Sequence, residues 1–381
     1  MSMGFQFQAV PALAAQLTAD RALSFAALGS LAGAYLLPGV VAALGSGWLG
    51  QRLGDIRTAL WGLGMMTLAG VCGWLAESFG AALLWRVVAG CGAVGLNVML
   101  TKMAADWFQD RDDLPTAMGV LVSSWPAGIA LAMVVVPPVA LWMGLGVAMI
   151  LPAVVAGAAL GLLALVWRAP PSRGGTVRTG SAGWLTRREL ALVLIAGGIW
   201  ALYNTSLIAV IAWTPGLLQA RGVDAIAAAA AVSLIGWLAI LSVAAGGWLA
   251  ARSPWRDLPA LACFGLSIAG YLAIIASGAA AASPWAMAAM GLVFGPAAAV
   301  IMTLPVEASR PQVRALTMGL YLAVYYLFMG VGPPMLGALR DVTGSAAAPL
   351  HAGAAMLVGC LVLWAGFRGL QRRGPETALG S

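Results

Sequence analysis

Long apolar stretches follow one another along almost the whole chain, and this leaves lipid as the only solvent in which the chain can fold. Of its 381 residues, 62% are hydrophobic and 9% are charged. A soluble domain carries roughly 25% charged residues, which it needs to cover its core. A helix that crosses a bilayer needs roughly 20 mainly apolar residues. The chain is therefore predicted to be an all-α membrane protein.

About twelve membrane spans are predicted from these stretches. The first is short, contains Gln6 and Gln8, and has no basic segment before it. It indicates either a start that lies downstream of the true one or a half-length first helix. The spans are predicted at residues 4–18, 23–50, 57–77, 80–106, 114–142, 145–167, 189–219, 224–251, 257–279, 281–307, 314–339 and 346–368.

Basic residues are distributed unequally between the two sides of the predicted membrane. With the N-terminus placed in the cytoplasm, sixteen of the 20 Lys and Arg residues fall in inside segments and three in outside segments. The remaining one, Arg86, lies within a span. Cytoplasmic loops carry such an excess of basic residues. We therefore expect a multi-pass protein of a bacterial inner membrane with both termini in the cytoplasm.

The chain repeats itself at an offset of 200 residues. The tripeptide Gly47-Trp48-Leu49 recurs as Gly247-Trp248-Leu249, and Trp85 recurs as Trp285. Six spans separate equivalent points, so the two halves have the same membrane orientation and are related by an axis along the membrane normal. We expect an N-terminal half at 1–167, a cytoplasmic linker at 168–188, a C-terminal half at 189–370 and a disordered tail at 371–381.

Two parallel six-helix halves are predicted to enclose a central cavity. Rocking one half on the other opens such a cavity to each side in turn, which is what a transporter requires and an enzyme does not. The one histidine and the four cysteines inside apolar runs form no catalytic or metal-binding pattern. No phosphate-binding loop is present, and the scattered basic clusters do not suit nucleic acid. We expect no enzymatic activity, no cofactor and no metal.

Residues 47–57 and 86–92 resemble the signatures of the major facilitator superfamily. The first segment reads GWLGQRLGDIR, with Gly50 where that family usually has aspartate, and the second reads RVVAGCG. The resemblance implies a monomeric secondary transporter, with the role of the missing aspartate shifted to Asp55. Residues 102–108 and 117–119 resemble the branch that contains cyanate and nitroimidazole transporters, which implies a small anionic or heteroaromatic substrate.

Arg86 is the first candidate for binding a substrate. An ionisable residue within a membrane span marks a functional site by default, and a guanidinium suits an anion. The alternative is that Arg86 holds backbone carbonyls of a neighbouring helix or reaches to the interface.

Polar and aromatic side chains of the seventh span form a second candidate site. Tyr203 and Asn204 lie three and four residues after Trp200 and so share its face. Such residues either line the cavity or bridge helices. Further substrate-binding candidates are Asn97, Tyr321 and Tyr325, and Gln6 and Gln8 could line the cavity from the first span.

Charged residues at the inner helix ends are candidates for a cytoplasmic gate. Lys102 and Asp106 are four residues apart and are expected to pair. Glu307 lies close in sequence to Arg310 and Arg314. The alternative is that these are static helix-end charges. The remaining candidates for this latch are Gly47, Arg52, Gly54, Asp55 and Arg57.

No Asp or Glu lies near the middle of a predicted span, where a proton symporter usually has one. Protons or a counter-solute are the candidate coupling partners. We expect a secondary active transporter that moves a small polar or anionic solute by rocker-switch alternating access. The alternative is a multidrug-type exporter with a mainly apolar cavity.

Overall fold

The computed structural model describes residues 1–108, 114–168, 184–252, 257–278 and 283–372, and within these ranges all regular structure is helical. Eleven helical segments of the described residues are long and apolar enough to cross a membrane. The first predicted span is present as two short helices. The prediction of an all-α membrane fold is confirmed.

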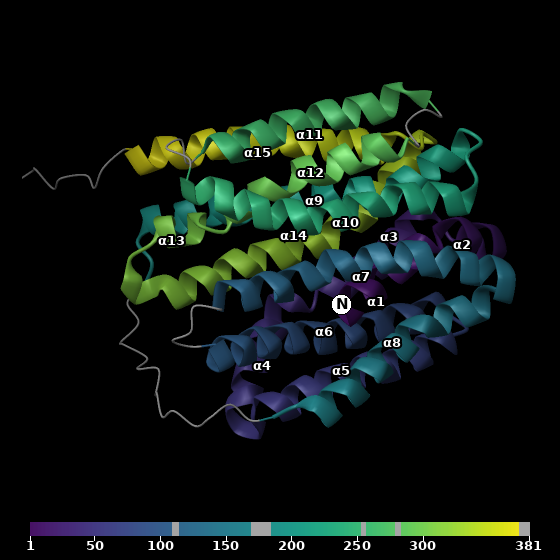
Figure 1. Cartoon of the computed structure of the whole chain (residues 1–381), viewed down its shortest axis with the longest axis horizontal. Coiled ribbons are helices and arrows are strands. Elements are labelled where there is room, and N and C mark those ends of the chain that lie inside the picture. The colour runs from purple at the N-terminus through teal and green to yellow at the C-terminus, as the bar shows by residue number, and fades with distance from the viewer. Residues whose placement is uncertain (109–113, 169–183, 253–256, 279–282, 373–381) are drawn as a thin grey trace, which may run out of the picture.

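The first eight helices pack against one another and form one half of the bundle (Figure 1). The linker end of the bundle is the end where α8 stops and α9 starts, and the far end is the opposite one. The helices of this N-terminal half are α1 (Ser2–Ala12), α2 (Ala14–Arg21), α3 (Phe25–Leu36), α4 (Gly39–Leu53), α5 (Asp55–Trp74), α6 (Phe79–Phe108), α7 (Leu114–Met143) and α8 (Leu145–Val166).

The remaining helices form the other half, drawn from teal to yellow in Figure 1. They are α9 (Arg187–Ala220), α10 (Ala225–Arg252), α11 (Leu258–Ala276), α12 (Pro284–Ile301), α13 (Leu304–Ala308), the 3₁₀ turn Pro311–Val313, α14 (Arg314–Thr343) and α15 (Ala348–Arg372). Most of the predicted linker and residues 373–381 of the predicted tail lie outside the described residues. The helix α15 continues to Arg372, two residues into that tail, because Gln371 still contacts Arg368 within the same half.

Two predicted spans are each broken into two helices at a proline. Pro38 separates α3 from α4, and Pro305 lies at the start of α13, just after α12 ends. Proline has no N–H to donate to the carbonyl four residues earlier, and its ring crowds that carbonyl. The breaks therefore follow from local chemistry.

Small residues bring the two halves together at the far end. The helix α3 packs along α14, and α7 packs along α10. A Cβ atom at Gly33 would lie 1.9 Å from the carbonyl oxygen of Gly330, and one at Gly29 would lie 2.2 Å from that of Pro333. Membrane helices use such small residues to approach closely, because lipid gives them no hydrophobic drive to associate.

We expect Gly33→Val to disrupt this seam. The added side chain has no space against Gly330, and overpacking of this kind costs on the order of 1–3 kcal/mol. Gly45→Val is the matched control, since a Cβ atom there meets no atom within 4 Å. The measurement is the midpoint of thermal unfolding of the purified protein. Equal midpoints for the two variants would show that the close approach of α3 and α14 does not contribute to stability.

Candidate functional site

Four of the predicted substrate-binding residues come together in one aromatic cluster between α9 and α14. The ring of Trp200 stacks on Tyr203, with centroids 5.7 Å apart, and on Tyr321 at 6.5 Å. Tyr325 lies 6.0 Å from the same ring. Trp200 and Tyr203 share a helix face, as their spacing predicted, whereas the two tyrosines of α14 join them only through the packing of α14 on α9.

The members of this cluster differ in what they can offer a ligand. Tyr203 and Tyr321 are buried, and the Tyr203 hydroxyl donates to the carbonyl of Phe294 at 2.6 Å. Trp200 and Tyr325 are half-buried and keep accessible surface. The cluster therefore has an inner pair that fixes its position and an outer pair, Trp200 and Tyr325, that is able to contact a solute.

Amide side chains lie near this aromatic wall. Asn204 is half-buried and donates to the carbonyl of Trp200 at 2.8 Å, and no hydrogen bond from a described residue reaches its amide oxygen. Asn97 on α6 is exposed and lies near Tyr326 of the other half. An exposed side chain that faces the other half lies at the edge of the space between them. Both predicted asparagines are thus available for polar contacts.

Tyr326 is one of the residues through which the two halves touch. A Cβ atom at Gly39, the first residue of α4, would lie 2.4 Å from the Tyr326 ring. Contacts between the halves continue from there towards the far end, through Gly33 and Gly29.

A capping contact closes the far end, and sequence reasoning missed it. The carboxylate of Asp341, on α14, accepts from the backbone N–H groups of Phe25 and Ala26 at 3.0 and 2.7 Å. It caps the start of α3 from the opposite half, which satisfies donors that a helix start otherwise leaves open. The Arg340 guanidinium lies 3.7 Å from the centroid of the Phe25 ring. Adjacent Arg and Asp residues at a helix end were the only signal in the sequence.

The predicted pair of Lys102 and Asp106 is present at the linker end, with a distance of 3.1 Å. Lys102 also binds Asp55, the residue to which the family resemblance assigns the role of the missing aspartate. A Cβ atom at Gly50 would lie 2.7 Å from the sulfur of Met99, so a larger residue at that position requires Met99 to shift. Gly54 has a φ of +88°, a conformation that favours glycine, and makes the turn into α5.

The surroundings of the other predicted latch residues differ from one residue to the next. The Arg52 guanidinium lies 4.2 Å from the centroid of the Trp48 ring, and Arg57 is exposed. Gly47 lies within α4, and the side chain of Arg314 is outside the described part of the structure.

Glu307 has a different partner from the one that its sequence neighbours suggest. It binds Arg368 of α15, which also binds Asp257, whereas Arg310 binds Glu189 with an Nε–Oε1 distance of 2.8 Å. The break before α13 turns Glu307 towards α15. Every ion pair among the described residues lies within a single half.

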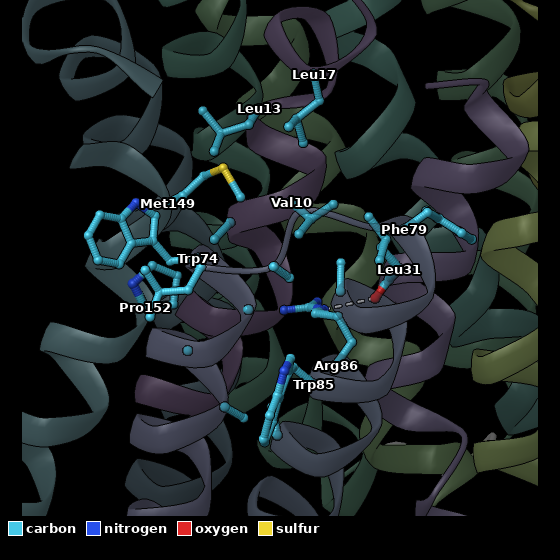
Figure 2. Close-up of a pocket in the computed structure, with 18 of the residues that line it drawn as sticks. Val10, Leu13, Leu17, Leu31, Trp74, Phe79, Trp85, Arg86, Met149 and Pro152 are labelled. Carbon is cyan, nitrogen blue, oxygen red and sulfur yellow. Dashed lines mark hydrogen bonds between the residues drawn. The ribbon is translucent and has the colours of Figure 1, made fainter. Parts of the chain in front are cut away.

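Arg86 lies inside the N-terminal half and donates to backbone carbonyls of two helices. Its Nε donates to Leu31 of α3 at 2.8 Å, and its terminal nitrogens donate to Gln6 at 2.8 Å and Phe7 at 3.2 Å. Figure 2 shows the guanidinium beside Leu31. These contacts correspond to the alternative interpretation of Arg86, and its role in substrate binding stays a prediction.

Pro11 explains why one of these carbonyls needs a partner. It lies inside α1, four residues after Phe7, and has no N–H to donate to the Phe7 carbonyl. Lipid supplies no donor, so another part of the protein must. Arg86 does so. The glutamines of α1 are also engaged within this half: Gln6 donates to the carbonyl of Met66 at 3.0 Å, and Gln8 is buried.

Among the described residues, no group of three or more His, Cys, Asp or Glu side chains is placed to hold a metal ion.

Comparisons with known proteins place the chain among transporters. Residues 1–333 match the Major Facilitator Superfamily. No curated protein sequence shows a significant match.

Solved structures with the same fold cover nearly the whole chain. A bacterial homologue of the human lysosomal transporter Spinster, in an inward-facing and unoccupied conformation, is 17% identical with a TM-score of 0.73, over 97% of this chain and 94% of the other. The nucleoside transporter NupG is 13% identical with a TM-score of 0.74, over 97% of each chain. A D-xylose-proton symporter is 14% identical with a TM-score of 0.72, over 95% and 94%.

We expect Arg86→Ala to destabilise the protein, and Pro11→Ala to restore part of the loss. Without the guanidinium the Phe7 carbonyl is unsatisfied, which costs on the order of 1–3 kcal/mol. Alanine at position 11 supplies the missing N–H. The measurement is a double-mutant cycle on thermal unfolding midpoints. Strict additivity of the two substitutions would contradict the assigned link between Pro11, Phe7 and Arg86.

Proposed function

Because this chain belongs to the Major Facilitator Superfamily and is a multi-pass secondary transporter that works by alternating access, we propose that it carries a small polar or anionic solute past the wall formed by Trp200 and Tyr325. The observation that carries this proposal is the accessible outer pair of the aromatic cluster, with the amides of Asn204 and Asn97 nearby. Apolar walls with a few placed polar groups are typical of small-ligand sites.

The contacts between the halves support a state that is closed at the far end. Asp341, Arg340 and the glycines of α3 join the halves there, whereas the ion pairs at the linker end stay within one half. The excess of basic residues at the linker end supports placing it in the cytoplasm of a bacterial cell, with both termini on that side. In that orientation, a state that is closed at the far end faces inwards.

Two features support a small heteroaromatic or anionic substrate. The accessible aromatic surface of Trp200 and Tyr325 suits contact with a planar solute, and amide N–H groups at Asn97 and Asn204 suit an acceptor-rich or anionic one. The resemblance of residues 102–108 to the branch with cyanate and nitroimidazole transporters agrees with this substrate class. Monomeric function and coupling to protons or to a counter-solute are part of the same proposal.

The position of the charges limits the direction of transport. No carboxylate of the described residues lies among Trp200, Tyr325 and the two asparagines, so a proton relay would depend on residues at helix ends such as Glu307. An anion that enters a negative interior works against about 2.3 kcal/mol per charge per 100 mV. For an anionic solute, exchange or export is therefore favoured over uncoupled uptake.

We propose that the linker-end ion pairs act as latches that rearrange when the halves rock. In the N-terminal half these are Lys102 with Asp55 and Asp106, supported by the turn at Gly54. In the C-terminal half they are Arg310 with Glu189 and Arg368 with Glu307. In the far-end-closed state each latch is satisfied within its own half, and closing the linker end would bring the two sets together.

A multidrug-type exporter is the second candidate function. It is favoured by the engagement of Arg86 with backbone carbonyls, which removes the one mid-span cation from the space between the halves. A mainly aromatic wall then remains, and bulky lipophilic cations would be its substrates.

We expect a ligand of the wall to bind at least tenfold more weakly to Trp200→Ala than to the unchanged protein. The measurement is ligand-induced thermal stabilisation against a panel of small anions and heteroaromatic compounds. Trp285→Ala is the matched control, because Trp285 is 84% exposed and belongs to no part of the cluster. Stabilisation only by bulky lipophilic cations would instead support the exporter. Hits that are unaffected by Trp200→Ala would remove the wall from the proposal.

We expect Asp341→Ala to shift the protein towards a state with an open far end. Loss of a helix cap costs about 1 kcal/mol, and this changes a two-state ratio by a factor of about 5. The measurement is the distance distribution between spin labels at positions 22 and 342, in a background without the native cysteines. Both positions are exposed and belong to different halves.

Asp224→Ala is the control for this shift. Asp224 caps α10 from within the same half, through the N–H groups of Ile226 and Ala227. Its loss should leave the distance distribution unchanged. An equal shift in both variants would mean that the cap on α3 does not hold the halves together.

A further inference from the structure

A pocket of about 620 Å³ lies within the N-terminal half and is separate from the space between the halves. Residues of α1, α2, α3, α5, α6 and α8 line it, and it extends to the turn between α5 and α6 at the far end. Its size is within the range of small-ligand sites, roughly 300–1,000 Å³. Rocking of one rigid half on the other would not open or close a pocket inside a single half.

The lining of this pocket is mainly apolar, and its polar residues include Gln6, Arg86, Glu77 and Ser78. Figure 2 shows Leu13, Leu17 and Met149 towards one end and Arg86 towards the other, with Trp74 at the side. Glu77 and Ser78 lie at the turn. A cation therefore lies deep in an otherwise apolar pocket, and the acidic side chain is at the far-end rim.

Arg86 has unused binding capacity. A guanidinium has five N–H groups, and three of those of Arg86 donate to backbone carbonyls. Carbonyl groups satisfy hydrogen bonds but do not neutralise the charge, and no ion pair of the described residues includes Arg86. Arg86 is half-buried and lines the pocket, so its remaining N–H groups are able to meet a ligand there. A charge in this position is costly until an anion joins it.

The length of the apolar lining limits what the uncharged part of a ligand can be. Leu17 is ten residues beyond Phe7 along α1 and α2, which corresponds to at most about 15 Å at 1.5 Å per residue. Leu13 and Val10 lie between them and also face the pocket. A ligand that follows this path needs a single anionic head and an unbranched hydrocarbon tail of medium length.

We propose that this pocket is a second binding site, which takes a medium-chain carboxylate with its head on Arg86 and its tail along α1 and α2. The carboxylate accepts the free N–H groups of the guanidinium, a charge-assisted contact of the strong kind. The tail fills the space between Val10, Leu13 and Met149. Because the site lies inside one half, its ligand stabilises that half and is not carried across the membrane.

The test measures binding of radiolabelled dodecanoate to the full chain in phosphatidylcholine nanodiscs. Ala82→Phe is designed to fill the pocket one helical turn from Arg86 without removing any contact of the guanidinium. Gly80→Phe is the matched control, since it does not line the pocket and a Cβ atom there meets no atom within 4 Å. Met149→Trp fills the pocket from α8 and replaces Ala82→Phe if that variant does not fold.

We expect saturable binding that is at least tenfold weaker in the pocket-filling variant and unchanged within twofold in Gly80→Phe. Unlabelled dodecanol, which has the same tail and no charge, should compete at least tenfold more weakly than dodecanoate. Equal binding by the pocket-filling variant, or equal competition by dodecanol, would overturn the proposal. Loss of dodecanoate binding in nanodiscs that contain phosphatidylglycerol would also overturn it, by assigning the anion to a phospholipid headgroup.

Discussion

The absence of water from the bilayer core is the constraint on which this structure depends. Every backbone N–H and C=O group in that region needs a partner within the protein, so the spans are helices and each interruption must be repaired. Pro11 leaves the Phe7 carbonyl without its helical donor, and Arg86 supplies one. At the far end, Asp341 supplies an acceptor for the open N–H groups at the start of α3. In both cases a charged side chain forms hydrogen bonds with backbone groups of another helix.

This constraint also shapes how the halves meet and separate. Lipid does not drive apolar helices together, so the far-end seam relies on close approach at Gly29 and Gly33 and on the cap at Asp341. The ion pairs among the described residues lie at the linker end, where water is available and where each pair is satisfied within one half. The seam and the latches therefore differ in chemistry. A rocking motion that opens the seam loses packing and a cap, and one that closes the linker end rearranges ion pairs.

Much of the candidate site could be predicted from residue spacing, because helices bring positions three and four residues apart to one face. Trp200, Tyr203 and Lys102 with Asp106 were found in this way. Contacts between helices could not be predicted: Glu307 binds Arg368, far along the chain, because the break before α13 turns it away from Arg310. The pocket beside Arg86 was likewise missed, since its lining comes from six helices.

The apolar composition by itself determined that this chain is a bundle of membrane helices, because the hydrophobic thickness of a bilayer and the helical rise fix how long an apolar span must be. The repeat at an offset of 200 residues determined that the bundle has two parallel halves. Only the tertiary structure decided which polar groups remain free for a ligand. Trp200 and Tyr203 look alike as neighbours on one helix face, yet packing of α11 and α12 buries Tyr203, whereas Trp200 stays accessible. Burial depends on the side chains of other helices, and a single stretch of sequence does not carry that information.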